Sequence, residues 1–267
     1  MKPASANLQV SAFLTSLPLD FLPAVREIAE LGFMHVDVVG LAERPEEHLE
    51  ILADSGLLVS CAAVGRDLQS GQSLDAVALA ARRGAAELVQ RQITDAARLG
   101  ATCCYLVPGL DGSSAARSRF ADACRLLADF AGQRQMRLCV EHCPGRALPS
   151  VAVTLDWLDE TAHPNLMLLI DVGHCLISRE EPASAIQQAG ARLGYVHLDD
   201  NDGVGDLHWP LLNGRLTEEM LRAALTALHA VGYAGALALE FNAQNAEPVA
   251  ALREGKLLVE RCLNFCT

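Results

Sequence analysis

Eight short apolar runs alternate with segments of helical periodicity along the sequence, and this alternation restricts the folds that the chain can adopt. The runs have the length and the branched aliphatic content that are typical of buried parallel strands. They span residues 8–13, 33–39, 57–64, 101–107, 137–141, 166–171, 194–198 and 236–241. Between them, apolar residues recur at intervals of three and four, as in Leu22, Val25 and Ala29. Strands that alternate with such helices build an α/β fold in which helices cover the sheet.

Glycines and polar residues mark the expected boundaries of the helices. Five glycines stand where a helical pattern gives way to an apolar run, and we expect each to close a helix in the left-handed conformation. They are Gly32, Gly56, Gly100, Gly194 and Gly232. Proline, serine or threonine followed within two residues by an acid predicts capped helix starts at residues 18–20, 73–75 and 217–219.

Eight strands, each followed by a helix, predict a single (β/α)₈ TIM barrel that occupies residues 1–267 as one domain. Apolar residues make up 51% of the chain, which is enough for a deep core, and no linker or shift in composition divides it. An open doubly wound sheet is the alternative. Such a sheet places its ligand at one switch point, whereas polar candidates here follow four successive strands.

Four polar side chains stand at or just past the ends of the last four apolar runs. They are Glu141, Asp171, His197 and Glu240. Because the carboxyl ends of barrel strands converge on one mouth, we expect these side chains to meet there. Ionised groups rarely end apolar strands without a partner, since desolvation costs several kcal/mol. Three carboxylates and one imidazole suit a divalent cation such as Mn²⁺, Mg²⁺, Co²⁺ or Zn²⁺.

The stretches around these residues resemble the sugar phosphate isomerase/epimerase superfamily, the xylose isomerase-like TIM barrels. The similar stretches are Val140-Glu141-His142, Ile170-Asp171-Val172-Gly173-His174, Val196-His197-Leu198-Asp199-Asp200 and Leu239-Glu240. The resemblance implies that Glu141, Asp171, His197 and Glu240 bind one metal and that His174 contacts substrate. In the ketose 3-epimerases of this group, the matching glutamates remove and return a proton on opposite faces of the substrate. Glu141 and Glu240 are therefore the expected catalytic residues.

A second polar cluster follows the seventh apolar run. In the related endonuclease IV branch, an Asp-x-His pair and a histidine that match Asp206, His208 and His174 complete a multi-zinc site. The resemblance leaves two alternatives for these three residues, substrate binding or a second metal. Trp209 is expected either to stack on a sugar face or to anchor its loop.

The sequence also departs from both groups of relatives. Val107 stands where the endonuclease IV branch has a histidine, and the third run also ends without one, which disfavours a phosphodiesterase. Asp199 stands where many isomerases have a lysine, which weakens the case for a phosphorylated substrate. Arg66 and Arg146 follow the third and fifth runs, where either could supply an anion contact to the substrate.

Cysteine content and charge bear on location and partners. Nine cysteines, with no Cys-x-x-Cys pair and no signal-peptide layout in residues 1–10, predict reduced thiols and a cytoplasmic location. His142 is expected to point away from the mouth and to pack or bond elsewhere. Cys143 and Cys175 are expected to be packing thiols, with a role as a soft ligand as the alternative. A net charge of −12 argues against a nucleic-acid partner. The sequence contains no stretch of about 18 consecutive apolar residues, so we expect no membrane span.

We therefore expect a divalent-metal-dependent isomerase or epimerase of a small sugar or other hydroxy-carbonyl compound, acting through a metal-stabilised enediolate. A dehydratase or lyase of the inosose or dehydroshikimate type would use the same metal and the same enolate chemistry. A non-catalytic sugar-binding barrel is a further interpretation. The expected partners are a small polyhydroxy substrate and further copies of the chain in a homo-oligomer.

Overall fold

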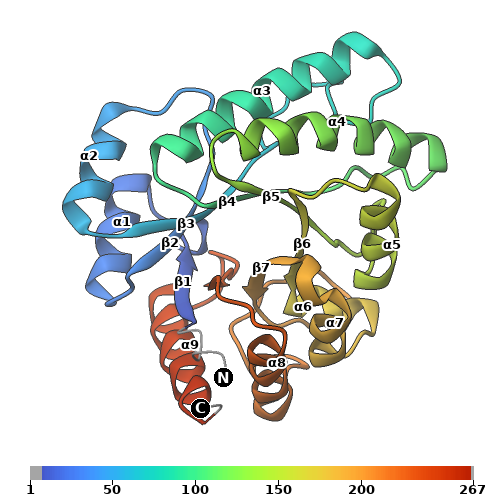
Figure 1. The fold of residues 1–267 in the computed structure, drawn as a ribbon. Coiled ribbons are helices and arrows are strands. Elements are labelled where there is room, and N and C mark those ends of the chain that lie inside the picture. The colour runs from blue at the N-terminus through green and yellow to red at the C-terminus, as the bar shows by residue number, and fades with distance from the viewer. Residues whose placement is uncertain (1–7, 266–267) are drawn as a thin grey trace, which may run out of the picture.

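A computed structural model describes residues 8–265, and its eight parallel strands close into a barrel (Figure 1). The strands follow one another around the barrel in chain order. They are β1 (Gln9–Phe13), β2 (His35–Val39), β3 (Leu58–Ala63), β4 (Cys103–Leu106), β5 (Arg137–Glu141), β6 (Leu166–Asp171), β7 (Leu193–Leu198) and β8 (Ala236–Leu239). The predicted (β/α)₈ TIM barrel is confirmed. The prediction of one domain over residues 1–267 stays a prediction, and most of the 1–10 segment and Cys266 lie outside the described residues.

Helices alternate with the strands and surround the barrel (Figure 1). They are α1 (Phe21–Glu30), α2 (Glu46–Ser55), α3 (Leu79–Arg98), α4 (Ser114–Gly132), α5 (Val151–Thr161), α6 (Val172–Ser178), α7 (Pro182–Ala189), α8 (Glu218–Ala230) and α9 (Pro248–Leu263). Short 3₁₀ turns lie at Leu14–Ser16 and Gly190–Arg192. Both α6 and α7 lie between β6 and β7, and α6 begins directly after Asp171. Within residues 8–265, none of the helices combines the length and the apolar character that crossing a bilayer requires.

The core has two layers, because successive side chains of a strand point to opposite faces of the sheet. The larger layer lies between the strands and the helices. The smaller layer fills the inside of the barrel and includes Phe13, Tyr105, Tyr195, Cys103 and Cys139. The thiols of Cys103 and Cys139 lie 3.4 Å apart and form no disulfide, as expected for packed, reduced cysteines.

Four of the five glycines predicted to end helices have the expected left-handed conformation. Gly32, Gly56, Gly100 and Gly232 all have positive φ, between +71° and +77°. The prediction for Gly194 is wrong, because this residue lies inside β7 and α7 already ends at Gly190. Gly194 is needed for another reason, since a Cβ there would lie 2.5 Å from the Cys139 thiol.

The predicted helix starts have mixed outcomes. The Thr217 hydroxyl accepts a hydrogen bond from the Met220 amide at the start of α8, as predicted. Helix α1 begins at Phe21, directly after the predicted start at residues 18–20, but the Asp20 side chain accepts no capping hydrogen bond in the described chain. The start predicted at residues 73–75 is wrong, because α3 begins at Leu79. The polar residues of this segment bond to each other instead and contribute to a cavity wall described below.

Replacing Gly194 with alanine should destabilise the fold by about 1–3 kcal/mol, the usual cost of overpacking a core. The added methyl would crowd the Cys139 thiol and the Met167 Cβ, 2.5 and 2.6 Å away. The control is Gly112→Ala, because a Cβ at Gly112 has no neighbour nearer than 3.8 Å among the described residues. Replacing glycine with alanine reduces the backbone entropy of the unfolded chain equally in both variants. The difference between their free energies of unfolding in urea therefore measures the crowding around position 194. Equal stabilities would contradict this account of Gly194.

Candidate metal centre

The four side chains predicted at the strand ends meet at the carboxyl end of the barrel. Glu141 and Asp171 are the last residues of β5 and β6, His197 lies in β7, and Glu240 directly follows β8. Each offers one donor atom, and these atoms all lie within 4.8 Å of one another. The first three side chains are buried, and Glu240 is 13% exposed. Four neighbouring strands thus assemble one cluster from residues that are distant in the sequence.

The donor atoms of this cluster lie close to one another, but in the described part of the chain they form no hydrogen bonds. His197 Nδ1 lies 2.6 Å from Glu240 Oε2 and 3.4 Å from Glu141 Oε1. Within residues 8–265, none of these three atoms has a partner in hydrogen-bond geometry, and neither has Asp171 Oδ2. Burying such atoms without partners costs several kcal/mol. Three carboxylates and one imidazole directed at one point fit a divalent cation of hard or borderline character.

The charges of the cluster shift the pKa values of its members. Burial lowers the pKa of His197, but the carboxylates of Glu240 and Glu141 outweigh burial and raise it well above its ordinary value. Burial would raise the pKa of Glu240, but the charge of His197 outweighs it and lowers the value. Burial would also raise the pKa of Asp171, yet three neighbouring histidines lower it to about 2. A proton on His197 therefore compensates the same negative charge that a cation would compensate.

A buried acid that was not predicted from the sequence lies deeper in the barrel, next to His197. Asp37 accepts hydrogen bonds from Ser11 Oγ and Tyr195 Oη, both at 2.7 Å. Its Oδ2 lies 3.9 Å from His197 Nε2. Burial raises the pKa of Asp37 to about 7, although the charge of His197 and the two hydrogen bonds lower it. The available signal was an aspartate between the valines of β2.

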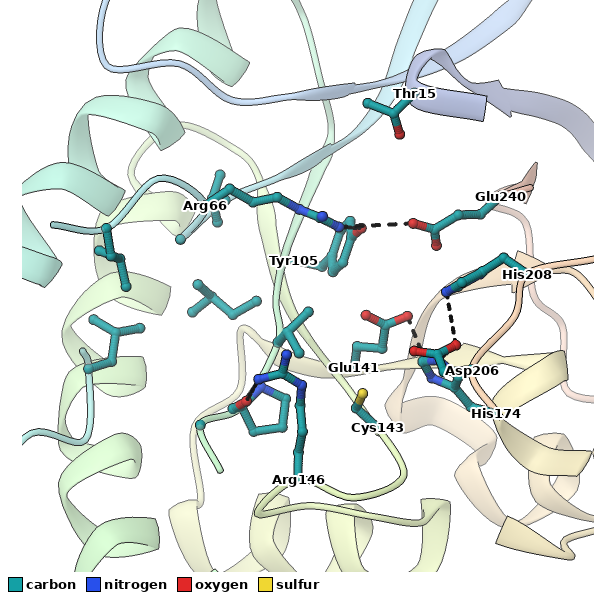
Figure 2. Close-up of a pocket in the computed structure, with 18 of the residues that line it drawn as sticks. Thr15, Arg66, Tyr105, Glu141, Cys143, Arg146, His174, Asp206, His208 and Glu240 are labelled. Carbon is teal, nitrogen blue, oxygen red and sulfur yellow. Dashed lines mark hydrogen bonds and ion pairs between the residues drawn. The ribbon is translucent and has the colours of Figure 1, made fainter. Parts of the chain in front are cut away.

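A cavity of about 640 Å³ opens onto the cluster (Figure 2). Glu141 and Glu240 both line it, and Figure 2 shows Arg66 and Arg146 pointing into it. Arg66 Nη2 donates to Tyr105 Oη at 3.1 Å and lies 4.0 Å from Glu240 Oε1. Both arginines proposed for anion contact are thus in the cavity wall. Tyr105 was not singled out from the sequence, because a tyrosine in an apolar strand is indistinguishable from a core residue.

His174, Asp206 and His208 lie together at the edge of the same cavity (Figure 2). Asp206 Oδ1 lies 3.1 Å from His174 Nε2 and 3.0 Å from His208 Nε2. The other ring nitrogen of His174 donates to the His142 carbonyl oxygen at 2.9 Å. A single carboxylate oxygen therefore holds both imidazoles, which differs from the predicted three-donor arrangement for a second metal. The donors within metal-binding range are grouped differently, as Cys143, His174 and Asp206, and as Asp171, Asp199 and His208.

Trp209 does not line the cavity among the residues that the structure describes. Its backbone pairs with Asp200 through two hydrogen bonds of 2.7 and 3.0 Å, and it borders a separate surface pocket. Of its two expected roles, the geometry agrees with loop anchoring. His142 is buried and its Nε2 lies 3.2 Å from the Asp171 carbonyl oxygen, as expected for a residue that bonds away from the mouth. Cys175 packs near it, whereas Cys143 lines the cavity.

The loop between β7 and α8 is held by one buried carboxylate. Asp200 is fully buried and accepts hydrogen bonds from the amides of Asn201, Gly214 and Leu216 at 2.6–2.8 Å. Its neighbour Asp199 is also fully buried but has no such donors in the described chain. Burial and the nearby charge of Asp171 raise the pKa of the Asp199 carboxyl well above its ordinary range.

Comparisons with known proteins agree with this architecture. The sequence pattern of the xylose isomerase-like TIM barrel family matches residues 25–262. A 3-dehydroshikimate dehydratase from Bacillus anthracis is 26% identical over 98 residues, which are 37% of this chain and 35% of that protein. The structure of a 3-keto-D-glucoside 4-epimerase from E. coli is similar with a TM-score of 0.81 at 18% identity, covering 96% of this chain and 100% of that one. An L-ribulose 3-epimerase is similar with a TM-score of 0.81 at 20% identity, covering 97% and 95%.

Replacing Asp200 with asparagine should loosen the loop over residues 199–217. An amide group offers one acceptor oxygen, so at least one backbone N–H loses its partner, at a cost of about 1–3 kcal/mol. Native-state hydrogen exchange at the Gly214 and Leu216 amides would report this as faster exchange by about one to two orders of magnitude. The matched control is Asp202→Asn, whose carboxylate is exposed and holds only a local turn. Unchanged protection of both amides would contradict the assigned role.

Proposed function

Because the chain belongs to the xylose isomerase-like TIM barrel family, we propose that it is a divalent-metal-dependent isomerase or epimerase of a small hydroxy-carbonyl compound. The observation that carries the proposal is the cluster of Glu141, Asp171, His197 and Glu240. Each residue of the cluster has a donor atom without a hydrogen bond within residues 8–265, and Glu141 and Glu240 line the cavity. Proteins with a similar fold are named as epimerases of D-psicose, L-ribulose and 3-keto-D-glucoside.

The four residues of the cluster would hold the cation. When bound, such a cation supplies stabilisation for the negative charge that develops on a carbonyl oxygen when a proton leaves the neighbouring carbon. Glu141 and Glu240 reach the cavity from β5 and β8 and would take and return that proton. His174 and Arg66 lie in the same cavity wall and would orient the hydroxyl groups of the substrate.

The two oxygens of Glu240 have different surroundings, which suits a residue with two tasks. Glu240 Oε2 lies 2.6 Å from His197 Nδ1, inside the donor cluster. Glu240 Oε1 lies 4.0 Å from Arg66 Nη2, on the cavity side. One oxygen can therefore serve the cation while the other exchanges a proton with the substrate.

The nitrogen atoms of His197 also have different neighbours. Nδ1 faces the carboxylates of the cluster, and Nε2 faces Asp37 at 3.9 Å. This separation is longer than a hydrogen bond, so Asp37 acts on the imidazole through its charge, which favours the proton on Nε2 and leaves Nδ1 free for a cation. Asp37 would thus act as a positioning residue for His197.

A dehydratase is the second candidate, and two observations favour it. The segment similar to a 3-dehydroshikimate dehydratase indicates a relative whose name denotes loss of water from a carboxylate compound. Arg66 and Arg146 in the cavity would suit a substrate that carries such an anionic group. Both reactions begin with removal of a proton next to a carbonyl group, so the same glutamates serve either one.

Removal of metal by EDTA should abolish turnover, and added Mn²⁺ should restore it. Substrates are found by incubating the metal-loaded protein with a panel of ketoses and hydroxy-keto acids in D₂O. Isomerisation or epimerisation introduces deuterium at one carbon and conserves the carbon skeleton and its oxygens, whereas dehydration removes one water, and NMR and mass spectrometry separate the two outcomes. The absence of bound metal together with the absence of turnover would refute the proposal.

Replacing Glu240 with glutamine should lower kcat by about 10²- to 10⁴-fold, because an amide cannot act as a base. The control is Glu247→Gln, an exposed glutamate after the same strand that does not line the cavity in the described chain. Equal kcat values for both variants would remove Glu240 from the catalytic machinery. Ligand binding without turnover in any variant, the wild type included, would identify a sugar-binding barrel.

A further inference from the structure

Tyr105 differs from the other two tyrosines of the chain in how its hydroxyl group is bonded. Tyr195 Oη donates to Asp37 Oδ1 at 2.7 Å, and Tyr233 Oη donates to a backbone carbonyl oxygen at 2.8 Å. Tyr105 Oη instead accepts a hydrogen bond from Arg66 Nη2 at 3.1 Å. Within residues 8–265, the proton of this hydroxyl group has no acceptor. Tyr105 therefore carries a hydrogen-bond donor that the described chain does not use.

The hydroxyl group of Tyr105 borders the cavity at the candidate metal centre. Tyr105 is only 1% exposed, yet it lines the cavity together with Glu141 and Glu240. Figure 2 shows its side chain in the middle of the cavity wall, beside the tip of Arg66. A buried donor without an acceptor is destabilising, and an oxygen atom of a ligand in the cavity would supply the acceptor.

The position of Tyr105 relative to the donor cluster is fixed by the barrel. Tyr105 lies in β4, which pairs with the strand that ends at Glu141. Its ring contacts the His197 ring edge-on, with 5.0 Å between the centroids and 86° between the planes. Side chains on strands are held more precisely than side chains on loops. The hydroxyl group is thus held beside the cluster before any substrate binds.

Arg66 is held in place behind this hydroxyl group. The buried Gln92 side chain in α3 accepts a hydrogen bond from the Gly65 amide at 2.7 Å and donates one to the Arg66 carbonyl oxygen at 2.9 Å. These bonds fix the backbone from which Arg66 reaches Tyr105. A cationic donor on a hydroxyl oxygen draws electrons from the O–H bond and makes the hydroxyl group a stronger donor. Arg66 therefore strengthens the donor at the cavity wall.

Tyr105 keeps its proton at neutral pH. Burial raises the pKa of its phenol well above the ordinary value, and the charges of Glu240 and Glu141 raise it further, although Arg66 lowers it. The proton that leaves a substrate carbon must therefore pass to a carboxylate, as in the proposed function. A neutral donor directed at an oxygen on which negative charge develops stabilises the transition state.

We propose that Tyr105 is a further catalytic residue, whose hydroxyl group donates a hydrogen bond to the substrate oxygen that becomes negatively charged when the neighbouring carbon loses its proton. The inference rests on the proposed metal-dependent function. The O–H bond of Tyr105 is not broken, so the only proton that moves is the one passing between the substrate carbon and a glutamate.

The probe for this role is oxalate, a planar dianion whose adjacent oxygens resemble those of an enediolate. Its affinity for the Mg²⁺-loaded full-length protein is measured by isothermal titration calorimetry. Tyr105→Phe should weaken oxalate binding by about tenfold or more, because the anion loses a buried hydrogen bond. Tyr233→Phe is the matched control and should bind oxalate like the wild type, since Tyr233 is also buried but does not line the cavity in the described chain.

A second comparison separates Tyr105 from Arg66. If Tyr105 donates directly, Tyr105→Phe still weakens oxalate binding when Arg66 has been replaced by methionine. An effect that disappears in the Arg66→Met background would reduce Tyr105 to a positioning residue for Arg66 and overturn the inference. With a substrate found in the panel, Tyr105→Phe should lower kcat by about 10²-fold and change KM less, because the contact strengthens as charge develops.

Fluorine NMR gives a readout that does not depend on variants with weakened binding. The chain contains three tyrosines, so protein labelled with 3-fluorotyrosine gives three signals, each assigned by its loss in the corresponding phenylalanine variant. Saturating oxalate should shift the Tyr105 signal and leave the Tyr233 signal in place. Mg²⁺ is suitable here because it is diamagnetic.

The outcomes distinguish this inference from the proposed function. Unchanged oxalate affinity in Tyr105→Phe, or an unshifted Tyr105 signal in the oxalate-saturated protein, would overturn the role of Tyr105 and leave the proposed function intact. A wild-type protein that does not bind oxalate in the presence of Mg²⁺ would refute both.

Discussion

The pairing of β1 with β8 is the interaction on which the rest of the structure depends. Residues 9–12 pair in parallel with residues 236–239, and this contact turns an open sheet into a barrel. Closure directs the carboxyl ends of all strands toward one mouth. Glu240, the residue after β8, then lies beside Glu141 and Asp171, the last residues of β5 and β6, and these side chains form the donor cluster with His197. In an open sheet, the end of β8 would lie at an edge, several strand widths from β5.

Buried carboxylates at this mouth are stabilised in different ways. Asp200 receives three backbone amides, and Asp37 receives two hydroxyl groups on one oxygen. Glu141, Asp171 and Asp199 are also buried, and each of them, like Asp37, has at least one oxygen without a hydrogen bond within residues 8–265. Glu141, Asp171 and Asp199 each belong to a donor group that includes a histidine, as do Glu240 and Asp206. Burial alone does not distinguish the neighbours Asp199 and Asp200. Asp200 accepts hydrogen bonds from three backbone amides, whereas burial and the charge of Asp171 raise the pKa of the Asp199 carboxyl.

Sequence patterns predicted the fold and the members of the candidate cluster well. Strand ends are recognisable because apolar runs stop at Glu141, Asp171 and Glu240, and barrel topology then brings these ends together. The failures have local physical causes. Gly194 leaves room for the side chains of Cys139 and Met167 rather than ending a helix, and Asp37, which the sequence analysis did not single out, lies beside His197 only because the barrel closes. Such contacts depend on neighbours that no local pattern specifies.

The sequence by itself determined the alternation of strands and helices, the polar residues at the strand ends and the chemical character of the donors. These properties follow from residue types and their spacing, which act over a few positions of the chain. Only the tertiary structure decided which donors share a point, because distances across the mouth depend on barrel closure and on loop conformation. It placed Asp199 rather than Asp206 beside Asp171, and it placed Asp37 next to His197. A side chain acquires such neighbours only after the chain has folded.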